Sequence, residues 1–252
     1  MTADPSGTAV DVTTRRAARG TATVFVLSGV AISSLLSRVP QIRDALHLSP
    51  RSLGLLLLMI AYPNTRPMCS ANCDGAAAAV LVSGAKLKTL SLEQQRRAVK
   101  VSASVLTTDP WEEACQILPN VNTLTRNAAR QAYEKAGVGP QDLDLVELHD
   151  CFATAELVHY DNLMLCDEGG AVDFFESGAP WRDGATPVNV SGGLQSKGHP
   201  ISATGIANVW EVAHHLRGEA GPRQIEGAKV GLAHVIGLGS ACGVHILEKS
   251  AA

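Results

Sequence analysis

The sequence predicts an α/β fold from about residue 99 to the C-terminus, because strand-like and helix-like stretches alternate there. The strand-like stretches are residues 99–106, 144–148, 187–190, 229–235 and 243–248. The helix-like stretches are residues 120–137, 154–165 and 203–217. This alternation predicts a mixed five-stranded sheet with helices on its faces. In such folds ligands bind at the carboxyl ends of the strands, so the loops there are the first place to look for a site.

Each element rests on a local pattern. The run VKVSASVL at 99–106 alternates apolar and polar residues, which is typical of a strand. Residues 120–137 place an apolar stripe on one side of a helix, and Gly137 fits its C-terminal stop. Apolar residues also recur at helical spacing in 203–217, at Ile206, Val209, Trp210, Ala213 and Leu216.

Three further stretches complete the prediction. Ala76–Val82 is an unbroken apolar run that follows an Asp74-Gly75 turn signal, so we expect a strand there. Residues 91–100 are charged and predict a helix or a loop. Residues 167–183 are rich in glycine and acidic residues and predict a loop.

Composition narrows the class of protein. The chain has 252 residues, of which 46% are hydrophobic and 18% charged, which is enough to build a substantial core. The formal net charge is −3 and there is no basic block, which argues against a nucleic-acid partner. The six cysteines form no CxxC pair, so we expect no metal site and separate, reduced thiols in a cytoplasmic protein.

The first 61 residues differ from the rest. Residues 21–36 carry no charge, and a second apolar run covers residues 52–62. The first run is short for a membrane span, which needs about 20 residues, and basic residues on both sides leave its orientation open. A signal peptide and a buried core helix are the other interpretations. Membrane association would involve residues 20–62 only.

The run SRVPQIRDALHLSPRSLGLLLLMIA, Ser37–Ala61, resembles the opening of a major facilitator superfamily transporter. The resemblance covers roughly residues 15–61 and stops within the second span. A transporter needs many more spans than this chain offers. We therefore expect residues 1–61 to be an apolar helical segment, from a truncated or fused transporter-like piece or from a gene-model error.

Two stretches carry the candidate chemistry. The first is NVSGGLQSKGHPISATG, residues 189–205, which places His199 on a glycine-rich loop at the start of a helix. Such a loop lets the backbone approach a ligand and favours negative charge, and a histidine there suits acid–base chemistry. The second is HDCF, residues 149–152, at the end of a neighbouring strand. By themselves, these residues are more often explained by a structural turn, a core or capping histidine and a buried thiol.

Together these stretches resemble the C-terminal half of a thiolase, of the sterol-carrier-protein-2 or lipid-transfer-protein type. The matching runs occur in the family's order and are CDGAAAAVLVSG at 73–84, HDCF at 149–152, NVSGGLQSKGHPISATG at 189–205 and the glycine turn near 237–239. The resemblance covers about residues 66–249. It implies three parts: the apolar segment 1–61, a remnant of a thiolase N-terminal half at 62–98, and a thiolase C-terminal domain at 99–252.

The resemblance implies a role for each matched residue. His199 would activate a nucleophilic cysteine and help to bind the thioester oxyanion, and Cys151 would be a second catalytic thiol that moves protons. His149 stands where other thiolases keep an asparagine that holds an oxyanion-hole water. Asp150 is expected to orient or cap. The resemblance places the substrate pocket at Ser191, Gly192, Gly193, Lys197, Gly198, Gly237 and Gly239.

The implied function is 3-oxoacyl-CoA thiolysis or condensation, with acyl-CoA as the substrate and no covalently bound cofactor. The cysteine that forms the acyl-enzyme lies in the half that is mostly missing here, so we expect the isolated chain to be inactive. A homodimer or a thiolase-like partner subunit is the expected assembly. The alternatives are a partner-dependent subunit of an acyl-CoA lyase and a membrane-protein fragment.

Overall fold

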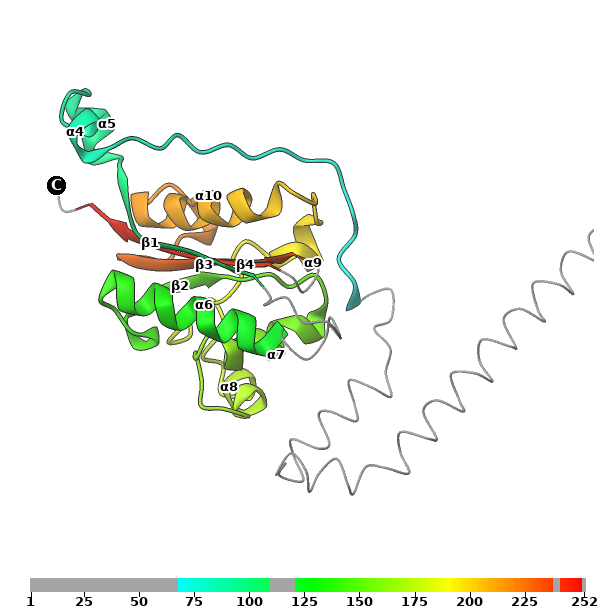
Figure 1. Ribbon diagram of the computed structural model, residues 1–252. Helices are drawn as coiled ribbons and strands as arrows, with labels where there is room; N and C mark the ends of the chain where they lie inside the picture. The colour runs from blue at the N-terminus through cyan, green and yellow to red at the C-terminus, as the bar shows by residue number, and fades with distance from the viewer. Residues whose placement is uncertain (1–67, 109–120, 238–240, 251–252) are drawn as a thin grey trace, which may run out of the picture. The chain divides into compact units, whose positions relative to one another are not determined.

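The computed structural model describes residues 68–108, 121–237 and 241–250. Residues 64–252 form one compact unit. Its centre is a sheet with the strand order β1-β4-β3-β2 (Figure 1). The strands are β1 (Val99–Thr108), β2 (Leu145–Glu147), β3 (Val230–Gly237) and β4 (Ala241–Lys249). The sheet is mixed, because β4 runs antiparallel to both of its neighbours and β2 runs parallel to β3.

Helices cover both faces of this sheet, as the sequence predicts. Helices α6 (Val121–Ala136) and α7 (Ala153–Asn162) lie on one face, and α10 (Thr204–Arg217) lies on the other (Figure 1). The remaining helices are short: α4 (Gly84–Leu87), α5 (Leu92–Arg96), α8 (Ala171–Glu176) and α9 (Gly193–Lys197). Two single 3-10 turns, η2 (Pro140–Asp142) and η3 (Gly221–Arg223), complete the unit.

A small-residue stripe brings α6 close to the sheet. Ala128, Ala129 and Ala132 have no exposed surface and pack in one core with strand residues such as Val244 and Ile246. A second core lies under α10, where Val212 and Leu216 meet Leu145 of β2. The sheet is therefore buried on both faces, and the polar residues at its strand ends are held on a rigid frame.

The fifth expected strand, residues 187–190, is present only as a bridge. Val188 pairs with Val146 of β2 in parallel, and the Val146 and Asn189 N–H groups complete the pair. Pairing stops at Asn189, whose φ of 51° turns the chain out of the sheet. The bridge still sets the glycine loop beside the carboxyl end of β2.

Two local predictions were wrong. Ala76–Val82 forms no strand, and Val80 and Leu81 are 90% and 80% exposed. An extended apolar run needs a neighbouring strand for its N–H and C=O groups, and the described part of the chain supplies none there. The stretch 167–183, predicted as a loop, contains α8, whose Ala171 is buried in the α6 core.

The predictions for residues 1–61 lie outside the described residues. Within the part of the chain that the structure describes, no helix has the length and apolar character needed to cross a membrane.

Candidate functional site

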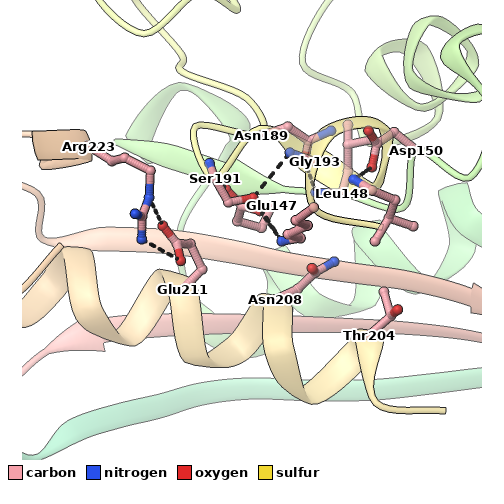
Figure 2. A network of polar contacts seen from close by, with 12 residues as sticks. Glu147, Leu148, Asp150, Asn189, Ser191, Gly193, Thr204, Asn208, Glu211 and Arg223 are labelled. Carbon is pink, nitrogen blue, oxygen red and sulfur yellow. Dashed lines mark hydrogen bonds and ion pairs between the residues drawn. The ribbon is translucent and has the colours of Figure 1, made fainter. Parts of the chain in front are cut away.

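The glycine loop is tied to the end of β2 by a series of polar contacts (Figure 2). The Asn189 side-chain oxygen accepts the Leu148 N–H at 2.9 Å, and the Asn189 amide donates to Glu156. The Glu147 carboxylate accepts both the N–H and the hydroxyl of Ser191, at 3.0 and 2.6 Å. These bonds place residues 189–191 directly beside residues 147–148.

Asp150 continues this series and acts as an external cap. Its carboxylate accepts the Leu194 N–H at 2.8 Å and the Gln195 N–H at 3.4 Å, both in the first turn of α9. A carboxylate at this end of a helix satisfies N–H groups that have no partner within the helix. Asp150 therefore orients and caps the start of α9, which is the role expected from the sequence.

Two glycines of the loop have no room for a side chain. Gly193 has a φ of 60°, and a Cβ atom there would collide with the Asp150 carboxylate. Gly198 has a φ of 83°, and its Cβ would lie 2.7 Å from the Cys73 sulfur. Both positions combine left-handed backbone with close approach, which glycine alone tolerates well. They let the loop fold tightly against 71–73 and β2.

His199 is fixed on both its backbone and its ring. Its N–H donates to the Ala71 carbonyl at 2.8 Å, and its Nδ1 lies 2.7 Å from the Thr204 hydroxyl oxygen. That hydroxyl oxygen also lies 3.1 Å from the Pro200 carbonyl and can donate its proton to it. When the hydroxyl does so and accepts from Nδ1–H, the Nε2 lone pair of His199 is available to accept a proton.

The structure brings His199 and His149 together. Their rings meet edge to face, with centroids 5.0 Å apart and planes at 79°. His149 is buried, and burial together with the nearby His199 lowers its pKa to about 4, so it is neutral at pH 7. Burial also lowers the pKa of His199, against an opposing effect of Asp150. The site therefore presents two neutral imidazoles side by side.

Cys151 follows at the same strand end and is partly buried. Burial is the main cause that raises the pKa of its thiol, which keeps it protonated at neutral pH. The Cys151 carbonyl accepts the Ser70 N–H at 3.0 Å. The next residue, Phe152, forms an isolated antiparallel β-bridge with Cys69 through the backbone. A protonated thiol held in this way suits a proton donor better than a ready nucleophile.

The resemblance assigns further residues to a substrate pocket. Gly192 immediately precedes α9 and has a φ of 92°. Ser191 and Lys197 contact each other and Glu147, with Lys197 Nζ 2.8 Å from the Ser191 hydroxyl. Gly237 lies at the end of β3, in register with Ala241 of β4. Gly239 lies outside the described residues.

Among the residues that the structure describes, there is no group of three or more His, Cys, Asp or Glu side chains arranged to hold a metal ion.

Sequence reasoning missed Glu147, Asn189, Glu156 and Thr204 as parts of this site. Glu147 left a signal, because a charged residue inside the apolar run LDLVEL is unusual for a buried strand. Thr204 follows His199 by five residues and its role depends on a hydroxyl orientation that no spacing reveals. Asn189 and Glu156 meet across 33 residues of sequence.

Comparison with known proteins places this arrangement in a family. Residues 114–249 match the family described as "Thiolase C-terminal domain-like". The chain is 45% identical to human "Sterol carrier protein 2" over 176 residues, which are 69% of this chain and 32% of that protein. It is 40% identical to "Acetyl-CoA acetyltransferase" of Methanothermobacter thermautotrophicus over 192 residues, 76% of this chain and 49% of the relative.

Two further relatives extend this set. "Benzoylsuccinyl-CoA thiolase subunit BbsB" of Thauera aromatica is 34% identical over 72% of this chain and 46% of its own length. The solved structure "Ltp2-ChsH2(DUF35) aldolase" shares the fold, with a TM-score of 0.51 at 20% identity, over 61% of this chain and 40% of that chain. The chain thus spans about a third to a half of the lengths of these curated relatives. The matched domain and the relatives together show that the chain belongs to the thiolase C-terminal domain-like family.

Proposed function

We propose that this chain supplies the histidine and proton-donor half of a thiolase-type acyl-CoA acyltransferase site. The observation that carries the proposal is the bond from His199 Nδ1 to Thr204, which leaves Nε2 free to accept a proton beside the neutral His149. A general base needs this tautomer and this access, and a thiol is the group that a thiolase must deprotonate.

The proposed reaction is cleavage of 3-oxoacyl-CoA by free coenzyme A, or its reverse. His199 takes the proton of a nucleophilic cysteine, whose sulfur then attacks the 3-oxo carbonyl. The bond between the α and β carbons breaks, and its electron pair leaves on the α carbon of the shorter acyl-CoA. Cys151 donates the proton that this carbon takes up, which fits its protonated thiol. The coenzyme A thiol then gives its proton to the Cys151 thiolate and attacks the acyl-cysteine. The carbon–sulfur bond to the cysteine breaks, and that sulfur takes back the proton held by His199.

We propose that the nucleophilic cysteine comes from a thiolase first half on a partner chain. The family resemblance places that cysteine in the first half, and the matched region makes up 49% of the Methanothermobacter relative. We further propose that residues 62–98 are the remnant of such a first half, that residues 99–252 are the C-terminal domain, and that residues 1–61 are unrelated to both. The exposed Val80 and Leu81 are consistent with a missing neighbour.

A direct test is reconstitution. The full chain is co-expressed with the first half of the Methanothermobacter relative, and acetoacetyl-CoA cleavage with free coenzyme A is measured as acetyl-CoA formed. We expect the pair to turn over and the chain alone to be inactive. His199→Gln should lower turnover by about 10²–10⁴-fold, the usual contribution of a general base. His245→Gln is the control, because His245 contacts Ser104 within the sheet.

Two outcomes would overturn the proposal. Turnover by the chain alone would remove the need for a partner, and a stable but inactive pair would remove the acyltransferase assignment. A lyase with a companion subunit is the second candidate. The relative that is named as a thiolase subunit supports the companion subunit in this proposal, and the choice between thiolase and lyase is left to the test. Cleavage that needs no free coenzyme A would identify the lyase, since thiolysis consumes the coenzyme A thiol.

A further inference from the structure

Glu147 is a carboxylate buried without exposed surface at the carboxyl end of β2, two residues before His149. It accepts two hydrogen bonds from Ser191, and Lys197 Nζ lies 3.4 Å from its Oε2. Every one of these contacts comes from the glycine loop. A buried charge is costly unless it is paired and hydrogen-bonded, so this carboxylate depends on the loop as much as the loop depends on it.

The contacts of Glu147 form a triangle. Lys197 Nζ also contacts the Ser191 hydroxyl, at 2.8 Å, so the lysine, the serine and the carboxylate are mutually bonded. Ser191 lies at the start of the loop and Lys197 at the end of α9, two residues before His199. These bonds therefore hold both ends of the segment 191–197 against Glu147 at the end of β2, two residues before His149. Figure 2 shows Ser191 beside Glu147.

The other bonds between this segment and residues 148–150 hold its near side, while His199 beyond its far end is also held by Ala71 and Thr204. Asn189 bonds Leu148 before the loop begins, and Asp150 bonds the N–H groups of Leu194 and Gln195 in the first turn of α9. Lys197 is the loop residue by which Glu147 reaches the far end of α9. A change at Glu147 should thus be transmitted to His199 more directly than a change at Asn189.

We propose that Glu147 is a positioning residue that sets the distance between His199 and His149 through Ser191 and Lys197. The inference rests on the proposed function for its catalytic meaning, because the two imidazoles matter there as base and oxyanion partner. The distance between the His149 and His199 rings can be measured whether or not the chain turns over substrate. Replacement of Glu147 by glutamine keeps the size but removes the charge and places an amide N–H₂ against donors.

The test is nuclear magnetic resonance of the full chain and of Glu147→Gln. In the parent, nuclear Overhauser effects should connect the His149 and His199 rings. In the variant we expect them to weaken several-fold, and the pKa of His199 to rise towards its ordinary value as its ring becomes more solvated. Glu211→Gln is the matched control: it removes another buried, ion-paired carboxylate, on α10, which contacts Arg223 and not the loop. It should leave both signals unchanged.

A second variant keeps the test decisive where Glu147→Gln does not fold. Lys197→Met leaves the carboxylate bonded to Ser191 and should displace His199 in the same direction by less. Unchanged ring contacts and an unchanged His199 titration in a folded variant would overturn the inference. These readouts need neither a partner nor turnover, so a failure of the reconstitution and a failure of this inference are separate results.

Discussion

The His149 and His199 rings meet edge to face at a centroid distance of 5.0 Å, although 50 residues separate them in sequence. His149 lies two residues after the buried strand β2, and His199 sits on a loop that folds back over that strand end. Burial lowers the pKa of both rings, and the nearby His199 lowers that of His149 further, because a positive charge on one ring disfavours a charge on the other. Both imidazoles are consequently held in the neutral form that a proton acceptor needs.

The coupling predicts a shift in His149 when His199 is removed. Burial is the larger cause that lowers the pKa of His149 to about 4, and the nearby His199 adds to it. In His199→Gln the pKa of His149 should rise but stay below its ordinary 6.5. Titration of the His149 ring by nuclear magnetic resonance measures this. A return to the ordinary value would show that burial is not the main cause.

Cys151 should react slowly with iodoacetamide at neutral pH. Its pKa is raised, chiefly by burial, and only the thiolate is alkylated. Modification should increase with pH past the range where an ordinary cysteine has levelled off. Peptide mass spectrometry separates Cys151 from Cys73, which is exposed and serves as the internal reference. Faster labelling of Cys151 than of Cys73 at pH 7 would contradict a protonated donor.

The sequence predicted the main helices and strands of this fold better than the segments whose structure depends on a neighbouring part of the chain. The alternating run at 99–106 and the alanine stripe of 120–137 became β1 and α6, because each depends on local periodicity and burial. The run at 76–82 has the same local signal and forms no strand, because a strand also needs a neighbour. Likewise, HDCF and His199 could be found by motif, whereas the bonds of Glu147 and Thr204 depend on how the loop folds back.

Stability should fall as the pH drops below about 6.5. Burial lowers the pKa of His149 to about 4 and of His159 to about 3, and lowers that of His234 strongly. The unfolded chain therefore binds protons in a range where the folded chain does not, so protonation favours unfolding. Each histidine adds up to about 1.4 kcal/mol per pH unit within its range.

Urea unfolding between pH 7 and pH 4 checks this slope. His159→Gln removes one of the buried imidazoles. It should lower the number of protons taken up on unfolding by about one, and so reduce the slope of the free energy of unfolding against pH, whatever its effect on stability at pH 7. His245→Gln is the comparison, since its ring is less buried and burial alone lowers its pKa. A free energy of unfolding that stays constant from pH 7 to pH 5 would contradict the neutral histidine cluster.

Gly198→Ala should destabilise the loop by about 1–3 kcal/mol, the usual cost of a side chain in left-handed backbone. Its φ is 83°, and the new Cβ would meet the Cys73 sulfur. Gly84→Ala is the control, because a Cβ at Gly84 in α4 meets no atom within 4 Å. Adding Cys73→Ala should recover part of the loss but not all of it, since the backbone strain remains. Full recovery would show that contact alone excludes a side chain there.

Val80→Lys with Leu81→Lys should reduce aggregation and leave folding almost unchanged. These side chains are 90% and 80% exposed, so their removal should alter the free energy of unfolding by less than about 0.5 kcal/mol. An exposed apolar run is a template for pairing with another chain, and lysine opposes such pairing. The control Gln131→Lys with Gln141→Lys adds the same charge at exposed positions elsewhere. Light scattering and urea unfolding measure both effects, and equal protection by the control would mean that net charge, not the 76–82 run, governs aggregation.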